Sequence, residues 1–167
     1  FEQADQVVAA YEAERCDAFT TDKSTLSARL AKLKDPSAHT ILPETISKAA
    51  NGPVVRQGDE QWANLVRWTL NALVAGEELG VTAAKVDELS ANATDPEVRR
   101  LLGADADLGK LIGLDKDWAG RVLKAVGNYG EIYERNLGPK GAIVIPRENS
   151  LNRLWRDGGL LFSPSFQ

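Results

Sequence analysis

The sequence has 167 residues, of which 43% are hydrophobic and 26% are charged, a balance typical of a folded domain rather than a disordered chain. The formal net charge is −4 and no basic run stands out, which argues against a nucleic-acid-binding surface. No stretch of about eighteen apolar residues is present, so the sequence predicts no membrane-spanning helix. One cysteine, Cys16, and one histidine, His39, exclude an internal disulfide and a Cys/His zinc site.

The sequence contains no methionine. Because translation starts at methionine, we expect that the beginning was removed by processing or that the sequence belongs to a longer protein. A signal peptide would then not be visible in it.

The first residues predict a helix followed by a strand. Residues 4–14 carry apolar side chains at helical spacing on one side, with acidic residues and glutamine elsewhere: Val7, Val8 and Tyr11. Residues 15–21 contain Phe19 and two threonines, which suits a short strand.

A second helix and two short extended segments follow. Asp22 or Ser24 is suited to cap this helix, in which leucines recur every three or four residues, and Pro36 ends it because the residue before a proline resists the helical region. Residues 40–43 and 52–56 predict short strands. A few isolated strands do not make a stable sheet alone, which again indicates that part of the fold lies outside the sequence.

The remainder predicts almost only helix. Residues 82–115 predict short helical pieces, one of which starts at Pro96, and a second long helix runs from Trp118 to residues 136–139. That helix has glycines inside it, which often mark a close approach to a neighbour: Gly120, Gly127 and Gly130. The strongest helix covers residues 59–79, and we expect its apolar stripe to face the core: Trp62, Leu65, Val66, Leu70, Leu73 and Val74.

The sequence offers little catalytic chemistry. A thiolate pair of Cys16 and His39 is less favoured than a small buried cysteine in a strand and a packing or surface histidine. No Gly-x-Ser-x-Gly elbow is present, and the glycine pair at 158–159 lacks the context of a phosphate-binding loop. Four aspartates lack the spacing of a calcium loop and are typical of solvated helix ends: Asp105, Asp107, Asp115 and Asp117. We therefore predict no catalytic residue, metal or cofactor.

Asp22 stands out because it lies where a predicted strand ends and a helix begins. Such junctions line the ligand crevices of α/β folds, and a carboxylate there can receive the ammonium group of a ligand. A plain helix N-cap is the competing interpretation, and the local pattern alone favours it.

Several segments, read in order, resemble one protein family. Residues 11–24 (YEAERCDAFTTDKS) resemble a second-lobe segment of the periplasmic solute-binding proteins that serve amino-acid ABC transporters, in the general L-amino-acid subgroup. Segments in the family's order follow: 41–48 (ILPETISK), 52–59 (GPVVRQGD), 66–73 (VRWTLNAL), 128–138 (NYGEIYERNLG) and 158–164 (GGLLFSP).

The resemblance implies a helix-rich α/β chain that forms the C-terminal portion of a two-lobe, type II periplasmic-binding-protein fold with a helical C-terminal extension. It implies that residues 1–22 are the end of the second lobe and the return hinge, near residues 21–24. Residues 23–80 then return into the first lobe, and residues 81–167 are the helical extension.

The resemblance also implies a ligand site. The family's acid at this position binds the ligand α-amino group, which assigns that role to Asp22, flanked by Thr20 and Thr21. The family's arginine for the ligand carboxylate is expected in an N-terminal half outside the sequence. Two departures from the family concern local structure: Glu14 replaces a glycine that often ends the first helix, and residues 147–152 differ from the usual run.

These observations favour a fragment of a periplasmic receptor, and not an enzyme, that captures L-amino acids by hinge closure and delivers them to an inner-membrane ABC permease. An enzyme on a related α/β scaffold and an inactive proteolytic or truncated fragment are the alternatives. Alone, the chain is expected to bind amino acids no better than about millimolar, because one exposed ion pair contributes about 0–1 kcal/mol. We also expect it to self-associate or to retain the N-terminal half of the same protein.

Overall fold

The computed structural model describes residues 1–141, 143–148 and 150–166. The α-helices are α1 (Ala4–Glu12), α2 (Lys23–Leu30), α3 (Glu60–Glu78), α4 (Val86–Asn92), α5 (Pro96–Leu101), α6 (Trp118–Val126) and α7 (Tyr129–Leu137). Short 3-10 helices are η1 (Pro36–Ala38), η2 (Ala83–Lys85), η3 (Gly109–Ile112) and η4 (Trp155–Asp157).

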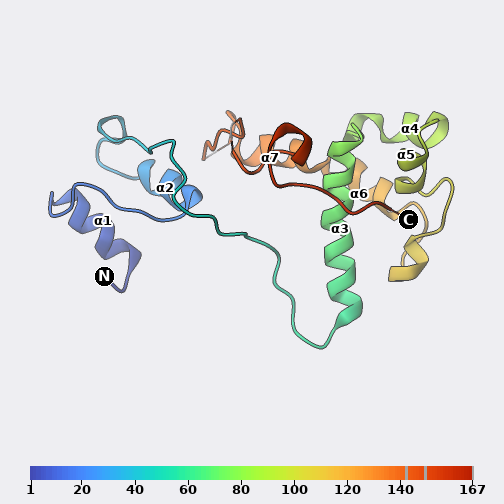
Figure 1. The fold of residues 1–167 in the computed structure, drawn as a ribbon, viewed down its shortest axis with the longest axis horizontal. Coiled ribbons are helices and arrows are strands. Elements are labelled where there is room, and N and C mark those ends of the chain that lie inside the picture. The colour runs from blue at the N-terminus through green and yellow to red at the C-terminus, as the bar shows by residue number, and fades with distance from the viewer. Residues whose placement is uncertain (142, 149, 167) are drawn as a thin grey trace.

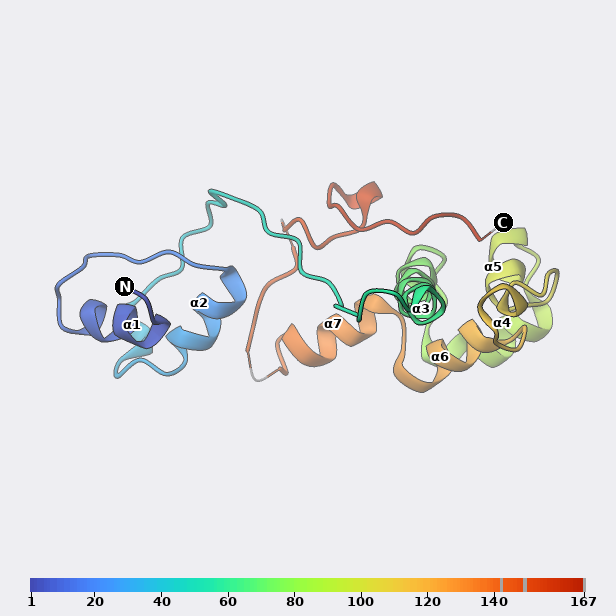
Figure 2. The same ribbon diagram turned by 90° about the horizontal axis from the view of Figure 1, so that it is seen from below.

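The helices form two groups joined by a long extended segment (Figure 1). Helices α1 and α2 lie together at one end, and α3 to α7 form a larger group at the other. The view from below shows the same separation and the C-terminal tail passing α3 to end near α5 (Figure 2). This arrangement confirms the helix-rich character expected from the sequence.

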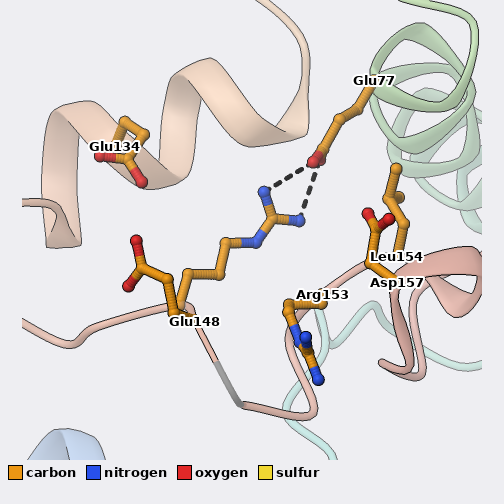
Figure 3. Close-up of a pocket in the computed structure, with 7 residues that line it drawn as sticks. Glu77, Glu134, Glu148, Arg153, Leu154 and Asp157 are labelled. Atoms are coloured by element: carbon orange, nitrogen blue, oxygen red, sulfur yellow. Dashed lines mark hydrogen bonds and ion pairs between the residues drawn. The ribbon is translucent and has the colours of Figure 1, made fainter.

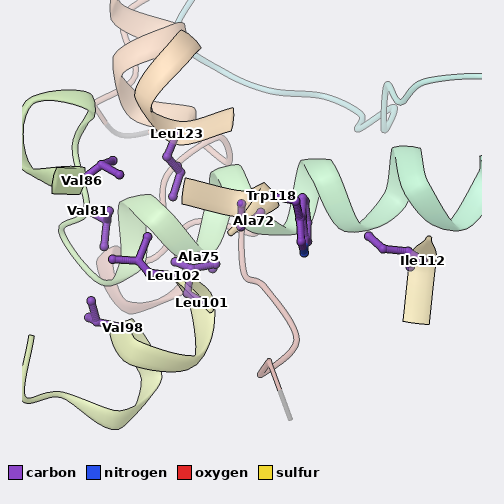
Figure 4. Packing of buried hydrophobic residues seen from close by; sticks show 11 residues of the cluster. Ala72, Ala75, Val81, Val86, Val98, Leu101, Leu102, Ile112, Trp118 and Leu123 are labelled. Carbon is purple, nitrogen blue, oxygen red and sulfur yellow. The ribbon is translucent and has the colours of Figure 1, made fainter. Parts of the chain in front are cut away.

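The hydrophobic core lies among α3 to α6 and the turns between them (Figure 4). Helix α3 contributes the small residues Ala72 and Ala75 from its C-terminal half, and Leu123 of α6 packs against them with no exposed surface. Removal of these apolar side chains from water is the main favourable contribution to the folding free energy of this helical group. The cluster comprises Ala72, Ala75, Val81, Val86, Val98, Leu101, Leu102, Ile112, Trp118, Ala119 and Leu123.

The prediction that the apolar stripe on α3 faces the core is only partly correct. Val74 is buried and Leu65, Val66, Leu70 and Leu73 are half-buried, but the side chain of Trp62 is 52% exposed. The first turns of α3 extend past α4 to α7 (Figure 1), and although the turn after η3 approaches Gln61, Trp62 stays largely exposed.

The prediction of one long helix from Trp118 is wrong, because α6 and α7 are separate. Gly127 breaks the helix with a φ of 84°, and Asn128 caps α7 in a capping box with Glu131. The Asn128 side chain accepts from the Glu131 N–H at 3.0 Å and the Glu131 carboxylate accepts from the Asn128 N–H at 2.9 Å. These reciprocal bonds satisfy two backbone N–H groups at the start of α7 that have no acceptor within the helix.

The strands predicted at residues 15–21, 40–43 and 52–56 do not form within the described residues, where an isolated parallel bridge between Leu154 and Leu161 is the only β-type pairing. A strand requires the backbone of a neighbour to pair with, and these segments find none among the residues that the structure describes. The short helical pieces after residue 82 are confirmed. Helix α5 starts at Pro96, and the Asp95 carboxylate accepts from the Glu97 N–H at 2.8 Å.

Helix α1 ends in a Schellman motif built around Glu14. The Arg15 N–H donates to the Ala10 carbonyl and the Glu14 N–H donates to the Tyr11 carbonyl, both at 3.0 Å. Glu14 has a φ of 57°, the only positive value at a described non-glycine residue. A side chain is disfavoured in this conformation, which accounts for glycine being the usual residue there.

Replacing Leu123 by alanine is expected to lower the free energy of unfolding by about 2–5 kcal/mol, because it leaves a cavity against α3. Leu111→Ala is the control, since that side chain is 81% exposed. Denaturant unfolding of the two variants measures the difference. Equal midpoints for both would contradict the core described here.

The Glu14→Gly substitution is expected to raise the free energy of unfolding by up to about 1 kcal/mol, because it relieves the left-handed backbone. The greater freedom of glycine in the unfolded chain offsets part of that gain. Glu12→Gly is the control and should destabilise, since residue 12 lies inside the helix. A lower melting temperature for Glu14→Gly would refute the strain argument.

Candidate functional site

Asp22 occupies the N-cap position of α2, and its backbone carbonyl accepts from the Leu26 N–H at 2.9 Å. Its side chain makes no capping hydrogen bond and no ion pair within the described residues. Asp59 and Asp95, at the starts of α3 and α5, accept backbone N–H groups at 3.0 and 2.8 Å. Asp22 is thus the N-cap residue of α2 by position, as the competing interpretation predicts, but its exposed carboxylate makes no capping hydrogen bond.

Thr20 and Thr21 lie beside Asp22 in the irregular segment between α1 and α2, and both are exposed. The structure brings the three predicted residues together by sequence adjacency, but neither of the two best-formed cavities includes them. The site is thus an open surface in the described chain.

The segment that carries Asp22 is braced by contacts between α1, α2 and the loop after them. The Tyr11 ring packs edge-on against Phe19 with ring centroids 5.2 Å apart, and its hydroxyl lies 2.7 Å from Nδ1 of His39. Arg29 of α2 contacts Asp5 of α1 at 2.5 Å. The Asp22 carboxylate is therefore presented from a loop fixed at both ends.

The structure also tests the roles that the sequence predicts for Cys16 and His39. His39 is half-buried and bonds to Tyr11, which confirms a packing role, and no thiol–imidazole hydrogen bond is present within the described residues. Cys16 is partly exposed in an irregular segment, so the expectation of a buried cysteine in a strand is wrong.

A second concentration of charge lies where α3, α7 and the tail meet, beside a cavity of about 210 Å³ (Figure 3). Arg147 donates from both terminal nitrogens to the two carboxylate oxygens of Glu77, at 2.6 and 3.0 Å. The side chains of this pair are only 13% and 18% exposed. The cavity is lined by Glu77, Glu134, Arg147, Glu148, Arg153, Leu154 and Asp157.

The surroundings of Arg147 satisfy its remaining bonding capacity. Its Nε donates to the Asn152 carbonyl at 2.8 Å, and its guanidinium lies 5.5 and 5.3 Å from the ring centroids of Tyr129 and Tyr133. Burial raises the pKa of the Tyr133 phenol above its ordinary value. The cluster is a structural link between α3, α7 and the tail.

Sequence analysis singled out residues 147–152 only as a departure from a family pattern and missed this pair. Glu77 and Arg147 are 70 positions apart, so no local spacing signals their contact. The glycine at position 130 is a partial sequence signal of this close contact. A Cβ there would lie 3.0 Å from the Glu77 carboxyl carbon. Glycine at this position therefore leaves room for the pair, and any larger residue would require the Glu77 carboxylate to shift.

The aspartates of residues 105–117 behave as solvated helix-end carboxylates. Arg99 contacts Asp105 and, by hydrogen bonding, holds the pKa of that carboxyl below its ordinary value. Arg121 contacts both Asp115 and Asp117, at 3.1 and 3.6 Å. In the described part of the chain, no group of three or more suitable side chains is placed to hold a metal ion.

Comparison with known proteins finds close relatives, although no protein-family model matches the chain. The general L-amino acid-binding periplasmic protein AapJ of Rhizobium johnstonii is 49% identical over 98% of this chain and 48% of its own length. The glutamate/glutamine/aspartate/asparagine-binding protein BztA of Rhodobacter capsulatus is 48% identical over 94% of this chain and 46% of its own. The putative amino-acid ABC transporter-binding protein YhdW of Escherichia coli is 44% identical over 98% and 48%.

The chain is a homologue of periplasmic amino-acid-binding proteins of ABC transporters. It spans about half the length of the curated relatives it matches. A solved ABC transporter periplasmic binding protein from Brucella ovis with glutathione bound matches all of this chain and 52% of its own, with 48% identity and a TM-score of 0.86. These matches confirm the resemblance to periplasmic amino-acid-binding proteins and the likeness in fold that the sequence motifs indicated. Within the described residues, no helix combines the length and apolarity needed to cross a membrane.

Replacing Arg147 by alanine is expected to lower the free energy of unfolding by about 3 kcal/mol, because it leaves the Glu77 carboxylate partly buried without its partner. Arg121→Ala is the matched control, since its ion pairs are more than half exposed and such pairs contribute about 0–1 kcal/mol. Chemical denaturation compares the two. Similar small losses would show that the Arg147 pair is not a structural link.

Proposed function

We propose that the chain is part of a periplasmic receptor that captures L-amino acids and delivers them to an inner-membrane ABC permease. The observation that carries this proposal is identity of 44–49% along nearly the whole chain to proteins named for amino-acid binding or transport. Under this proposal, residues 1–22 are the end of the second lobe with its return hinge. Residues 23–80 return into the first lobe, and residues 81–167 are a helical extension.

Asp22 is proposed to bind the α-ammonium group of the ligand, with the hydroxyls of Thr20 and Thr21 beside it. Support comes from its carboxylate, which is exposed, is unused as a cap and projects from the braced segment between α1 and α2. A charge-assisted hydrogen bond between a carboxylate and an ammonium is among the stronger polar contacts.

An open carboxylate is not sufficient for tight binding. One exposed ion pair contributes about 0–1 kcal/mol, whereas micromolar affinity requires about 8 kcal/mol. The remaining free energy is proposed to come from closure of a second wall over Asp22, which excludes water and supplies the cation for the ligand carboxylate. Hinge closure of this kind is a common way to bury a small ligand between two lobes.

The ligand class follows from what the relatives' ligands share. AapJ is named for general L-amino acids, BztA for four acidic and amide amino acids, and the solved neighbour holds glutathione. Each of these ligands carries an α-ammonium and an α-carboxylate on one carbon. A receptor that reads this pair through Asp22 recognises the shared head group and leaves selection of the side chain to other residues.

The receptor is proposed to make and break no covalent bond, so it needs no nucleophile, metal or cofactor. The relatives are solute-binding proteins by name. Of the two groups considered for catalysis, His39 bonds to Tyr11, and no hydrogen bond joins it to Cys16 within the described residues. The alternatives of an enzyme and of an inactive fragment have no comparable support.

In the full-length protein, Asp22→Asn is expected to weaken L-glutamate and L-glutamine binding by about 2–5 kcal/mol, because the ligand ammonium loses its anionic partner. Asp17→Asn is the matched control, since it removes an exposed carboxylate from the same segment. Titration calorimetry measures both affinities, and circular dichroism checks the fold. Unchanged affinity for Asp22→Asn would remove Asp22 from the site. No binding of any L-amino acid by the unaltered protein would refute the proposed function.

A further inference from the structure

The segment between α2 and α3 contains the single Asn-Gly pair of the sequence, Asn51 followed by Gly52. Both residues are exposed, and within the described chain neither takes part in a hydrogen bond. Asn-Gly pairs commonly form tight turns, but no turn is present at these two positions. The pair instead lies in the extended stretch that joins the two helical groups (Figures 1 and 2).

Gly52 leaves the space around its own backbone nitrogen open. A Cβ built on this residue would meet no atom within 4 Å, and glycine has no side chain to hinder an approach to its nitrogen. No acceptor among the described residues holds the Gly52 N–H. The side-chain carbonyl carbon of Asn51 can therefore reach the Gly52 nitrogen by rotation about single bonds, without the loss of a hydrogen bond.

We propose that Asn51 is a site of spontaneous deamidation, a reaction to which asparagine is prone. The Gly52 backbone nitrogen loses its proton to solvent and attacks the Cγ carbon of Asn51, so that a new C–N bond closes a succinimide ring. The Cγ–Nδ2 bond breaks, and Nδ2 takes up a proton and leaves as ammonia. Water then opens the ring at either carbonyl, which gives aspartate or isoaspartate at position 51. No enzyme is needed, because the nucleophile and the carbonyl belong to adjacent residues.

Asn92 shows how ordinary secondary structure opposes the same reaction. It is exposed and is followed by a small residue, Ala93, so it resembles Asn51 in its surroundings. Asn92 ends α4, however, and the Ala93 N–H donates to the Leu89 carbonyl at 3.0 Å. Ring closure there requires the end of the helix to open first, which adds a free-energy cost. The asparagines that also lie inside helices are Asn64, Asn71 and Asn136.

Deamidation changes both the charge and the backbone at this position. Either product adds one negative charge to a chain whose formal net charge is −4. Isoaspartate also routes the main chain through the former side chain of residue 51, which inserts a methylene group into the segment between α2 and α3. This inference is independent of the proposed function, because no step involves a ligand.

Incubation of the full-length protein at neutral pH without ligand, followed by proteolysis and mass spectrometry, tests the proposal. Asn51 should convert from amide to acid about 100-fold faster than Asn92, because the nitrogen that follows Asn92 is held in a helical hydrogen bond. The rate at Asn51 should rise with pH, since the deprotonated nitrogen is the nucleophile, and an isoaspartyl methyltransferase should label the peptide that carries residue 51. An intact Asn51, or equal rates at the two asparagines, would overturn the proposal.

Two variants separate the Asn-Gly pair from its structural setting. Gly52→Ala should slow deamidation about tenfold, because a Cβ hinders the approach of the reacting atoms. It should leave the melting temperature unchanged, since no atom lies within 4 Å of the added group. Ala93→Gly makes a second Asn-Gly pair at Asn92, which should still react at least about tenfold more slowly than Asn51, because the N–H that follows it stays bonded to Leu89. An unchanged rate in Gly52→Ala, or equal rates at the two pairs in Ala93→Gly, would contradict the role given to the open backbone.

Discussion

The larger helical group depends on the junction at Asn128, where a buried polar side chain joins three separate elements. Asn128 is 5% exposed, caps α7, and donates from its side chain to the Val81 carbonyl at 3.1 Å, just beyond α3. Glu131 extends the junction, because its carboxylate also accepts from the Ala83 N–H of η2 at 3.0 Å. A buried polar group is tolerated only when its bonds are satisfied, so this junction fixes the chain path around the core.

The same end of α3 also holds the tail, through two consecutive acids. Glu77 pairs with Arg147, and the Glu78 carboxylate accepts from the Trp155 indole and from the Ser163 N–H at 3.0 and 3.2 Å. Acidic residues at a helix C-terminus oppose the helix dipole. The guanidinium groups of Arg147 and Arg156 offset that cost, the latter by donating to the Glu78 carbonyl at 2.7 Å.

The parts of the fold that follow local rules were predictable from the sequence. The start of α5 at Pro96 and the start of α3 after Asp59 depend on a few adjacent residues. The unusual position of Glu14 was signalled only by a departure from the family pattern, since local periodicity placed it inside the first helix. The break at Gly127 was missed because a capping box competes with a helical stripe, and only the contact with Val81 decides between them. The exposed Trp62 could not be predicted, since periodicity identifies an apolar face but not how far its partner extends.

The candidate site shows the same limit of prediction from local sequence patterns. Asp22 and Asp59 occupy the same position relative to a helix, yet the Asp59 carboxylate accepts a backbone N–H and that of Asp22 does not. Residue type and local spacing cannot tell which aspartate at a helix start uses its carboxylate as a cap. Only the order of longer motifs pointed to a receptor. Helices α3 to α6 contain most of the buried apolar cluster, while Thr20, Thr21 and Asp22 are exposed in the segment before α3. Because these three side chains take no part in the core, substituting them leaves the packing of α3 to α6 unchanged, and an effect on binding can be read without an effect on folding.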